Sequence, residues 1–178
     1  MRRAALLAAV ALAGCASPRL AEFERTLAAQ DSATAALGQW CRARGIADPP
    51  AIRAEQAGRT AQPSTEVRRL LGVSENEPLA YRHVRLACGP AVLSEADNWY
   101  VPGRLDAEMN RTLATTDTPF GKVVAPLGFR RERLAAQRGR AADCPPGTVL
   151  SHRALLRLPD GRPLSLVTEC YTRANLAR

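Results

Sequence analysis

Lysine and aromatic side chains are scarce in this chain of 178 residues. It has a single lysine and 4% aromatic residues, although Lys and Arg together number 25 against 17 Asp and Glu and the formal net charge is +8. Proteins that bind nucleic acid usually combine a basic surface with aromatic rings that stack on bases. Because the arginines are spread along the chain and stacking residues are rare, we expect no nucleic acid partner.

The arginines are densest in one stretch of the second half. The members of this basic cluster are Arg130, Arg131, Arg133, Arg138 and Arg140. We interpret it as a solvated helix face followed by a loop, since residues 127–137 fit a strand that continues as a helix. Attraction of the cluster to anionic lipid or to a small anion is the alternative.

Motifs for metal binding, cofactor binding and covalent catalysis are also missing. No two cysteines form a C-x-x-C pair and only His83 and His152 could join them, so the spacing does not support a zinc site. A glycine-rich phosphate loop and a recognisable nucleophile motif are absent from the sequence too. We therefore expect no metal and no cofactor, and we interpret His152 as a structural histidine.

The first fifteen residues have the layout of an export signal. Met1-Arg2-Arg3 is positive, residues 4–13 are apolar but too short to span a bilayer comfortably, and Leu12-Ala13-Gly14-Cys15 ends in small residues and a cysteine. This ending resembles the lipobox of bacterial lipoproteins, in which the signal is removed and the cysteine is lipidated. An ordinary signal peptide or an N-terminal helix is the alternative.

The lipobox resemblance implies a signal peptide at residues 1–14, a lipidated tether at 15–20 and one folded domain at 21–178. The protein would then be held in the cell envelope by a lipid anchor at Cys15, by default on the outer membrane facing the periplasm. In such an oxidising compartment four further cysteines suggest two disulfides, with three possible pairings, while buried free thiols are the alternative. The disulfide candidates are Cys41, Cys88, Cys144 and Cys170.

A hairpin closes the chain and carries the first candidate for function. Asp160-Gly161 separates two apolar runs, which is a strong signal for a β-hairpin. The second run contains Glu169 between Leu164 and Tyr171, where a sheet normally has apolar side chains. A carboxylate at this position requires a reason, and a functional role is one.

A second hairpin is predicted from strands at 79–88 and 91–101, joined by Cys88-Gly89-Pro90. Since side chains alternate across a strand, His83 and Arg85 share one face and Arg82 takes the other. On the return strand Glu95, Asp97 and Trp99 share a face, with Ala96, Asn98 and Tyr100 opposite. So polar a strand has one solvated face or lines a wet cavity, where Asn98 would form hydrogen bonds.

Helices are expected at 21–30, 32–44, 66–71 and 105–113, and a short strand at 51–56. Thr118 suits an N-cap and Pro119 the first position of a further short helix. Such a helix start leaves the N–H groups around Phe120 and Gly121 free to attract an anion. Taken alone, the motif favours an ordinary helix start.

The order of these motifs resembles the chorismate lyase-like family. Thr118-Pro119-Phe120-Gly121-Lys122, then Gly161-Arg162-Pro163-Leu164 and Thr168-Glu169, are similar to chorismate lyase, whose pattern is T-P-L-G-R and later G-K-P-L with T-E. Segments 71–79, 84–86 and 100–102 are equally similar to the UTRA ligand-binding domain of GntR-type regulators, which shares that fold. The resemblance runs from about residue 66 to 176. It implies a single α+β domain, a mainly antiparallel sheet with helices packed on it and a ligand cavity at one side.

The resemblance also implies roles for individual residues. Glu169 matches the catalytic glutamate of the family, and Phe120 matches a leucine whose backbone binds the product carboxylate. His83 falls where the family has a product-binding arginine, and Arg85 or Arg153 could replace that arginine. The charged guanidinium binds a carboxylate through two hydrogen bonds, whereas a neutral histidine has one donor.

Two functions follow from these expectations. The first is an exported protein that binds a small carboxylate ligand beside Glu169 without catalysis. The second is a cofactor-free lyase of the chorismate lyase type, which would release pyruvate and 4-hydroxybenzoate with Glu169 as general acid.

Overall fold

The computed structural model describes residues 17–177. The expected signal peptide and the expected lipidation site Cys15 lie outside the described residues. Within the described part no helix has both the length and the apolar character needed to cross a membrane.

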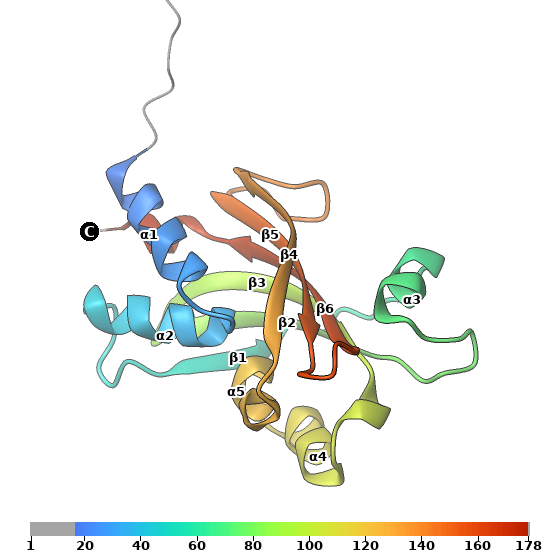
Figure 1. Cartoon of the computed structure of the whole chain (residues 1–178). Coiled ribbons are helices and arrows are strands. Elements are labelled where there is room, and N and C mark those ends of the chain that lie inside the picture. Colours follow the sequence, from blue (N-terminus) through green and yellow to red (C-terminus); the bar gives the residue numbers. More distant parts are fainter. Residues whose placement is uncertain (1–16, 178) are drawn as a thin grey trace, which may run out of the picture.

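One antiparallel sheet of six strands organises the domain (Figure 1), which confirms the expected fold class. Its strands in space follow the order β1-β2-β3-β6-β5-β4, so the two hairpins β2–β3 and β5–β6 meet at its centre. The bounds are β1 Ile52–Gln56, β2 Ala80–Cys88, β3 Ala91–Tyr100, β4 Arg130–Arg138, β5 Leu150–Arg157 and β6 Pro163–Tyr171. The predicted short strand and both predicted hairpins are present.

Helices α1 (Pro18–Ala28) and α2 (Ala33–Ala43) pack against one face of the sheet. Ser32 caps α2, because its hydroxyl accepts a hydrogen bond from the Ala35 N–H at 3.2 Å. Helix α1 begins three residues before the expected domain boundary at residue 21, and Leu20 is already part of the core. Residues 18–20 therefore belong to the fold and not to a tether.

The remaining helices are α3 (Thr65–Leu71), α4 (Ala107–Thr115) and α5 (Phe120–Val123), with 3-10 turns at Pro102–Arg104, Ala125–Leu127 and Arg173–Leu176. Helix α3 begins after the Ser64 cap and ends at Gly72 in the left-handed conformation, close to the expected range 66–71. It lies at the opposite end of the molecule from α1 and α2 (Figure 1). The expected N-cap at Thr118 is wrong, since Pro119 is the N-cap of α5 and the Thr118 hydroxyl bonds to Thr116.

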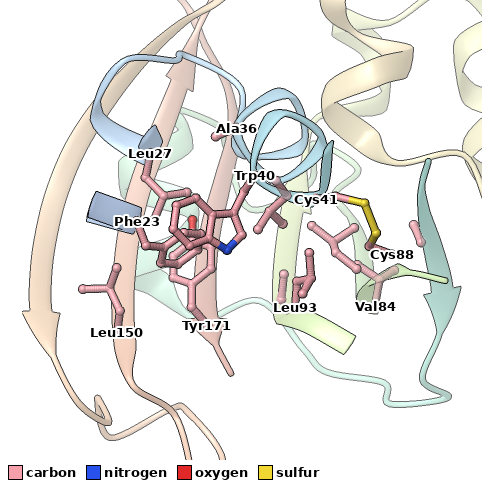
Figure 2. Packing of buried hydrophobic residues seen from close by; sticks show 14 of the residues in the cluster. Phe23, Leu27, Ala36, Trp40, Cys41, Val84, Cys88, Leu93, Leu150 and Tyr171 are labelled. Carbon is pink, nitrogen blue, oxygen red and sulfur yellow. A yellow bond between two sulfur atoms is a disulfide. The ribbon is translucent and has the colours of Figure 1, made fainter. Parts of the chain in front are cut away.

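The largest core cluster lies between α1, α2 and the sheet (Figure 2). Phe23 packs with its ring centroid 5.1 Å from that of Trp40 and 5.3 Å from that of Tyr171, which ties both helices to β6. A disulfide between Cys41 and Cys88 joins α2 to β2, and a second between Cys144 and Cys170 joins the 139–149 loop to β6. The structure thus selects one of the three possible pairings.

The basic cluster does not lie on a helix. Residues 130–138 form β4, an edge strand that pairs only with β5. Most of its side chains are exposed, including Leu134 at the bulge between Arg133 and Ala135. Charged residues on a sheet edge discourage pairing with other chains, which is sufficient to explain most of these arginines.

Candidate functional site

A small cavity lies on the face of the sheet that α1, α2 and α5 cover, which we call the cavity face. It has a volume of about 50 Å³ and separates the core beneath α1 and α2 from the smaller cluster around Val124 and Phe129. Its walls come from the middle of β2, β3 and β6, from Phe129, Arg131 and Leu156, and from the beginnings of α2 and α5. A cavity of roughly 150 Å³ can hold benzene, so this one has room for an anion of a few heavy atoms.

Arg82 places a buried positive charge at the cavity wall. Its exposed fraction is 5%, and it has only neutral hydrogen-bond acceptors: the Thr118 carbonyl at 3.4 Å and, with its amide turned to satisfy both groups, the Gln56 side-chain oxygen at 3.2 Å. Within residues 17–177 no carboxylate forms an ion pair with it, and burial lowers its pKa. A buried charge without a counter-charge is costly, and an anionic ligand would remove this cost.

Asn98 stands directly opposite Arg82 in the β2–β3 ladder and lines the same cavity. Its side-chain oxygen accepts a hydrogen bond from the Ser165 hydroxyl. Its side-chain Nδ2 is buried and has no hydrogen-bond partner among the residues that the structure describes. Directly opposed residues have Cβ atoms about 5 Å apart, so one ligand can receive hydrogen bonds from both side chains.

Glu169 lies on the same face but is already paired. Two guanidinium nitrogens of Arg131 contact its two carboxylate oxygens, Nη1 at 3.1 Å and Nη2 closer still, and the Tyr171 hydroxyl donates to it at 2.8 Å. Both charged side chains are less than 10% exposed. Burial would lower the pKa of Arg131, but the charge of Glu169 and its hydrogen bonds outweigh burial and raise it. The unexplained carboxylate is therefore half of a buried, bidentate ion pair.

The first residues of α2 and α5 close the cavity. A Cβ on Gly121 would lie 2.6 Å from the Ser32 hydroxyl oxygen, so only glycine allows α5 to approach α2 this closely. The Asp31 carboxylate accepts a hydrogen bond from the Arg131 N–H at 2.9 Å and attaches the α2 start to β4. The backbone N–H groups of Phe120 and Gly121 contact no acceptor in the described part of the chain.

The structure brings together four of the residues that the sequence nominated: Glu169, Phe120, Gly121 and Asn98. It does not bring the other three to this cavity. His83 and Arg85 point to the opposite face of β2, as strand alternation predicts, and Arg153 points away from the cavity on β5, where it binds Glu66 at 3.0 Å. The interpretation of these three as cavity residues is therefore corrected.

Sequence reasoning missed the two arginines that do line the cavity. For Arg82 half of the signal existed, because strand alternation puts it on the face opposite His83. The turn alone would have paired it with Asp97, and the bulge between Leu86 and Ala87 shifts the register so that it pairs with Asn98. Arg131 was named only as a member of the basic cluster, and its place at the cavity was not predicted because the range that contains it was expected to become helical. Its contact with Glu169 also crosses β5, the strand between β4 and β6, which is a purely tertiary relation.

The donors of this site suit an anion better than a metal. Arg82, Asn98 and Arg131 offer N–H groups, and within the described ranges no group of three His, Cys, Asp or Glu side chains could hold a metal ion. Buried N–H donors and a guanidinium can hold a carboxylate or a phosphate by charge-assisted hydrogen bonds, each worth about 1.5–3 kcal/mol.

No protein-family model matches the sequence. A curated relative does: the uncharacterized protein y4mC of Sinorhizobium fredii (strain NBRC 101917 / NGR234) is 41% identical over 173 residues. The match covers 86% of this chain and 73% of the relative.

Solved structures with a similar fold are ligand-binding domains of GntR-family regulators. The effector domain of PhnF from Mycobacterium smegmatis has a TM-score of 0.56 at 12% identity, over 80% of this chain and 88% of that domain. PhnF itself has a TM-score of 0.55 at 12% identity over 80% of this chain. The chain spans 64% of that regulator and 59% of the possible regulator YydK from Bacillus subtilis. At this identity the likeness establishes the fold alone.

Proposed function

Because the chain belongs to the family of the Sinorhizobium fredii protein y4mC and folds like a regulator effector domain, we propose that it is a ligand-binding protein that holds a small carboxylate in the cavity beside Glu169. The observation that carries the proposal is Arg82, a buried guanidinium with neutral partners at a cavity wall. The ligand would supply the missing negative charge, and Asn98 Nδ2 would donate a further hydrogen bond to it.

The Arg131–Glu169 pair has a different role in this proposal. Since each of its charges already has its counter-charge, it forms a rigid polar wall and leaves Arg82 as the anchor. The volume of about 50 Å³ favours compact anions such as acetate or pyruvate over aromatic acids.

Thermal unfolding with a panel of anions tests this proposal. Formate, acetate, pyruvate, phosphate, benzoate and 4-hydroxybenzoate would be compared at equal ionic strength. A ligand at a hundred times its dissociation constant adds about 2.7 kcal/mol of stability, which raises the Tm of a chain of this size by roughly 5–10 °C. We expect the largest increase from a small carboxylate.

Two variants on the same strand locate the effect. Arg82→Gln should abolish the increase in Tm, whereas Arg85→Gln should retain it, because Arg85 is half-exposed on the opposite face and pairs with Glu55 at 3.6 Å. Equal increases in both variants, or no increase for any anion with the wild type, would contradict an Arg82 site.

A lyase of the chorismate lyase type is the second candidate. The observation that favours it is that Arg82 adjoins His83, where the family's product-binding arginine was expected, and lines the cavity together with Glu169. Against it, both carboxylate oxygens of Glu169 already accept hydrogen bonds from Arg131, and one of them also from the Tyr171 hydroxyl, so they are engaged within the protein. Release of pyruvate from chorismate by the purified protein would decide for the lyase.

We also propose that the protein is exported and lipid-anchored in the cell envelope. The Leu12-Ala13-Gly14-Cys15 sequence supports this proposal, as do two disulfides, which persist mainly in oxidising compartments. Metabolic labelling with a radioactive fatty acid should label the wild type and not the Cys15→Ala variant. Label that survives the substitution would exclude Cys15 as the site.

A further inference from the structure

The other face of the sheet carries a wider hollow than the cavity. We call it the open-face groove: it lies between residues 59–67 on one side and residues 140–145 on the other, above β2, β3 and β6. It consists of two hollows of about 260 and 320 Å³ that share Arg59, Asp97 and Asp143. Ligand sites for molecules of drug size occupy about 300–1,000 Å³, so the groove has the volume of such a site and the cavity does not.

Two aromatic rings form part of the groove floor. Tyr81 and Trp99 lie side by side on β2 and β3, with ring centroids 4.6 Å apart, and both remain partly exposed. In a chain with 4% aromatic residues, two neighbouring rings, tilted by 39° to one another, give the bottom of this hollow an apolar surface.

Within the described residues most of the charged groups around the floor are paired, and Asp143 and Arg140 are the exceptions. Arg59 lies 3.7 Å from Asp97, and Arg153 lies 3.0 Å from Glu66. His83, which is 8% exposed, has Nδ1 2.9 Å from Asp97 and Nε2 3.1 Å from Glu95. A strongly charged ligand would have to break one of these pairs, whereas a neutral ligand with many hydroxyls can use their spare lone pairs and N–H groups.

The walls of the groove are firmly attached to the sheet. The Cys144–Cys170 disulfide, with Cα atoms 5.5 Å apart, fixes the 140–145 wall to β6. On the other side Val67 and Leu71 of α3 pack in a core cluster with Leu155 and Leu166. Walls held in this way lose little conformational freedom when a ligand binds.

We propose that the open-face groove is a carbohydrate-binding site, separate from the Arg82 cavity. A pyranose ring has an apolar C–H face and a rim of hydroxyl groups, which matches an aromatic floor beside planar charged side chains. The ring would lie on Trp99, with hydroxyls bonded by Asp97, Arg59 and Asp143. Asp143 is exposed and forms no ion pair in the described part of the chain, so its carboxylate is available. The inference does not depend on the anion proposed for the cavity.

Tryptophan fluorescence tests the proposal directly, because the chain has two tryptophans and Trp40 is 1% exposed. Quenching by acrylamide therefore reports on Trp99. Maltotriose, cellotriose and triacetylchitotriose would be added at millimolar concentration, with citrate and spermidine as anionic and cationic probes. We expect at least one trisaccharide to reduce the quenching constant about two-fold or more.

Substitutions then assign the effect to the groove. Asp143→Ala should lower the affinity for the trisaccharide that protects Trp99 at least five-fold. Because Asp143 is exposed, this variant should still fold. Arg85→Gln, which changes an exposed residue outside the groove, should leave its affinity unchanged. The proposal is overturned if no trisaccharide protects Trp99, if only a charged probe does, or if Asp143→Ala has no effect.

Discussion

The two faces of the sheet handle charge in opposite ways. On the cavity face Arg82 is buried with neutral acceptors, and the Arg131–Glu169 pair is buried beside it. On the open face the charges are more numerous but more exposed, and most of them are paired, as in Arg59–Asp97 and Arg153–Glu66. The lesson is that the number of charges near a hollow says little about its ligand. What matters is which charge lacks a partner and how far it is from water.

Breaking the buried Arg131–Glu169 pair should have the largest effect on the free energy of unfolding. In Glu169→Gln the guanidinium of Arg131 stays buried without its counter-charge, so we expect a loss of about 3–5 kcal/mol in the free energy of unfolding. Urea denaturation measures it. The double variant Arg131→Met/Glu169→Gln, which removes the stranded charge and keeps an acceptor for Tyr171, should recover much of the loss. If Glu169→Gln lost less than about 1 kcal/mol in the free energy of unfolding, the buried pair would contribute no more than an exposed ion pair does.

The buried side chain of His152 should make the stability of the protein depend on pH. Burial lowers its pKa to about 4, although the charge of Glu169 opposes this shift. Below pH 6.5 the unfolded chain takes up a proton that the folded chain rejects until about pH 4, so stability falls with decreasing pH over this range. The slope from this group is at most about 1.4 kcal/mol per pH unit.

The matched variant for this prediction is His152→Phe, which keeps a ring against Tyr171, where the two ring centroids now lie 5.3 Å apart. Denaturation at pH 7, 6, 5 and 4.5 should show a shallower decline for the variant. Parallel curves would mean that other groups produce the acid sensitivity.

Breaking the exposed Arg153–Glu66 pair should have the smallest effect on the free energy of unfolding. Arg153→Ala breaks the contact with Glu66, but the two side chains are 32% and 54% exposed, so we expect a loss of about 0–1 kcal/mol that shrinks with added salt. Urea denaturation at low and high salt measures it. A loss comparable to that of Glu169→Gln would remove the distinction between the two faces.

Local sequence signals were sufficient for most of the fold. The Asp-Gly turn appears where the sequence predicts it, and the expected helices at 32–44 and 66–71 are present, with Ser32 and Ser64 as their caps. Residues 130–138 were misread because an arginine-rich, alanine-containing stretch has helical propensity, and pairing with β5 overrides it.

The sequence by itself determined the hairpins and which side chains share a strand face, because turn chemistry and the two-residue period of a strand are local. Only the tertiary structure decided that Glu169 meets Arg131 across β5, that Arg82 and not His83 faces the cavity, and that Cys41 pairs with Cys88. Those relations depend on the order of strands and on which face the helices cover. No local interaction encodes them, since they arise when distant segments bury their apolar surfaces together.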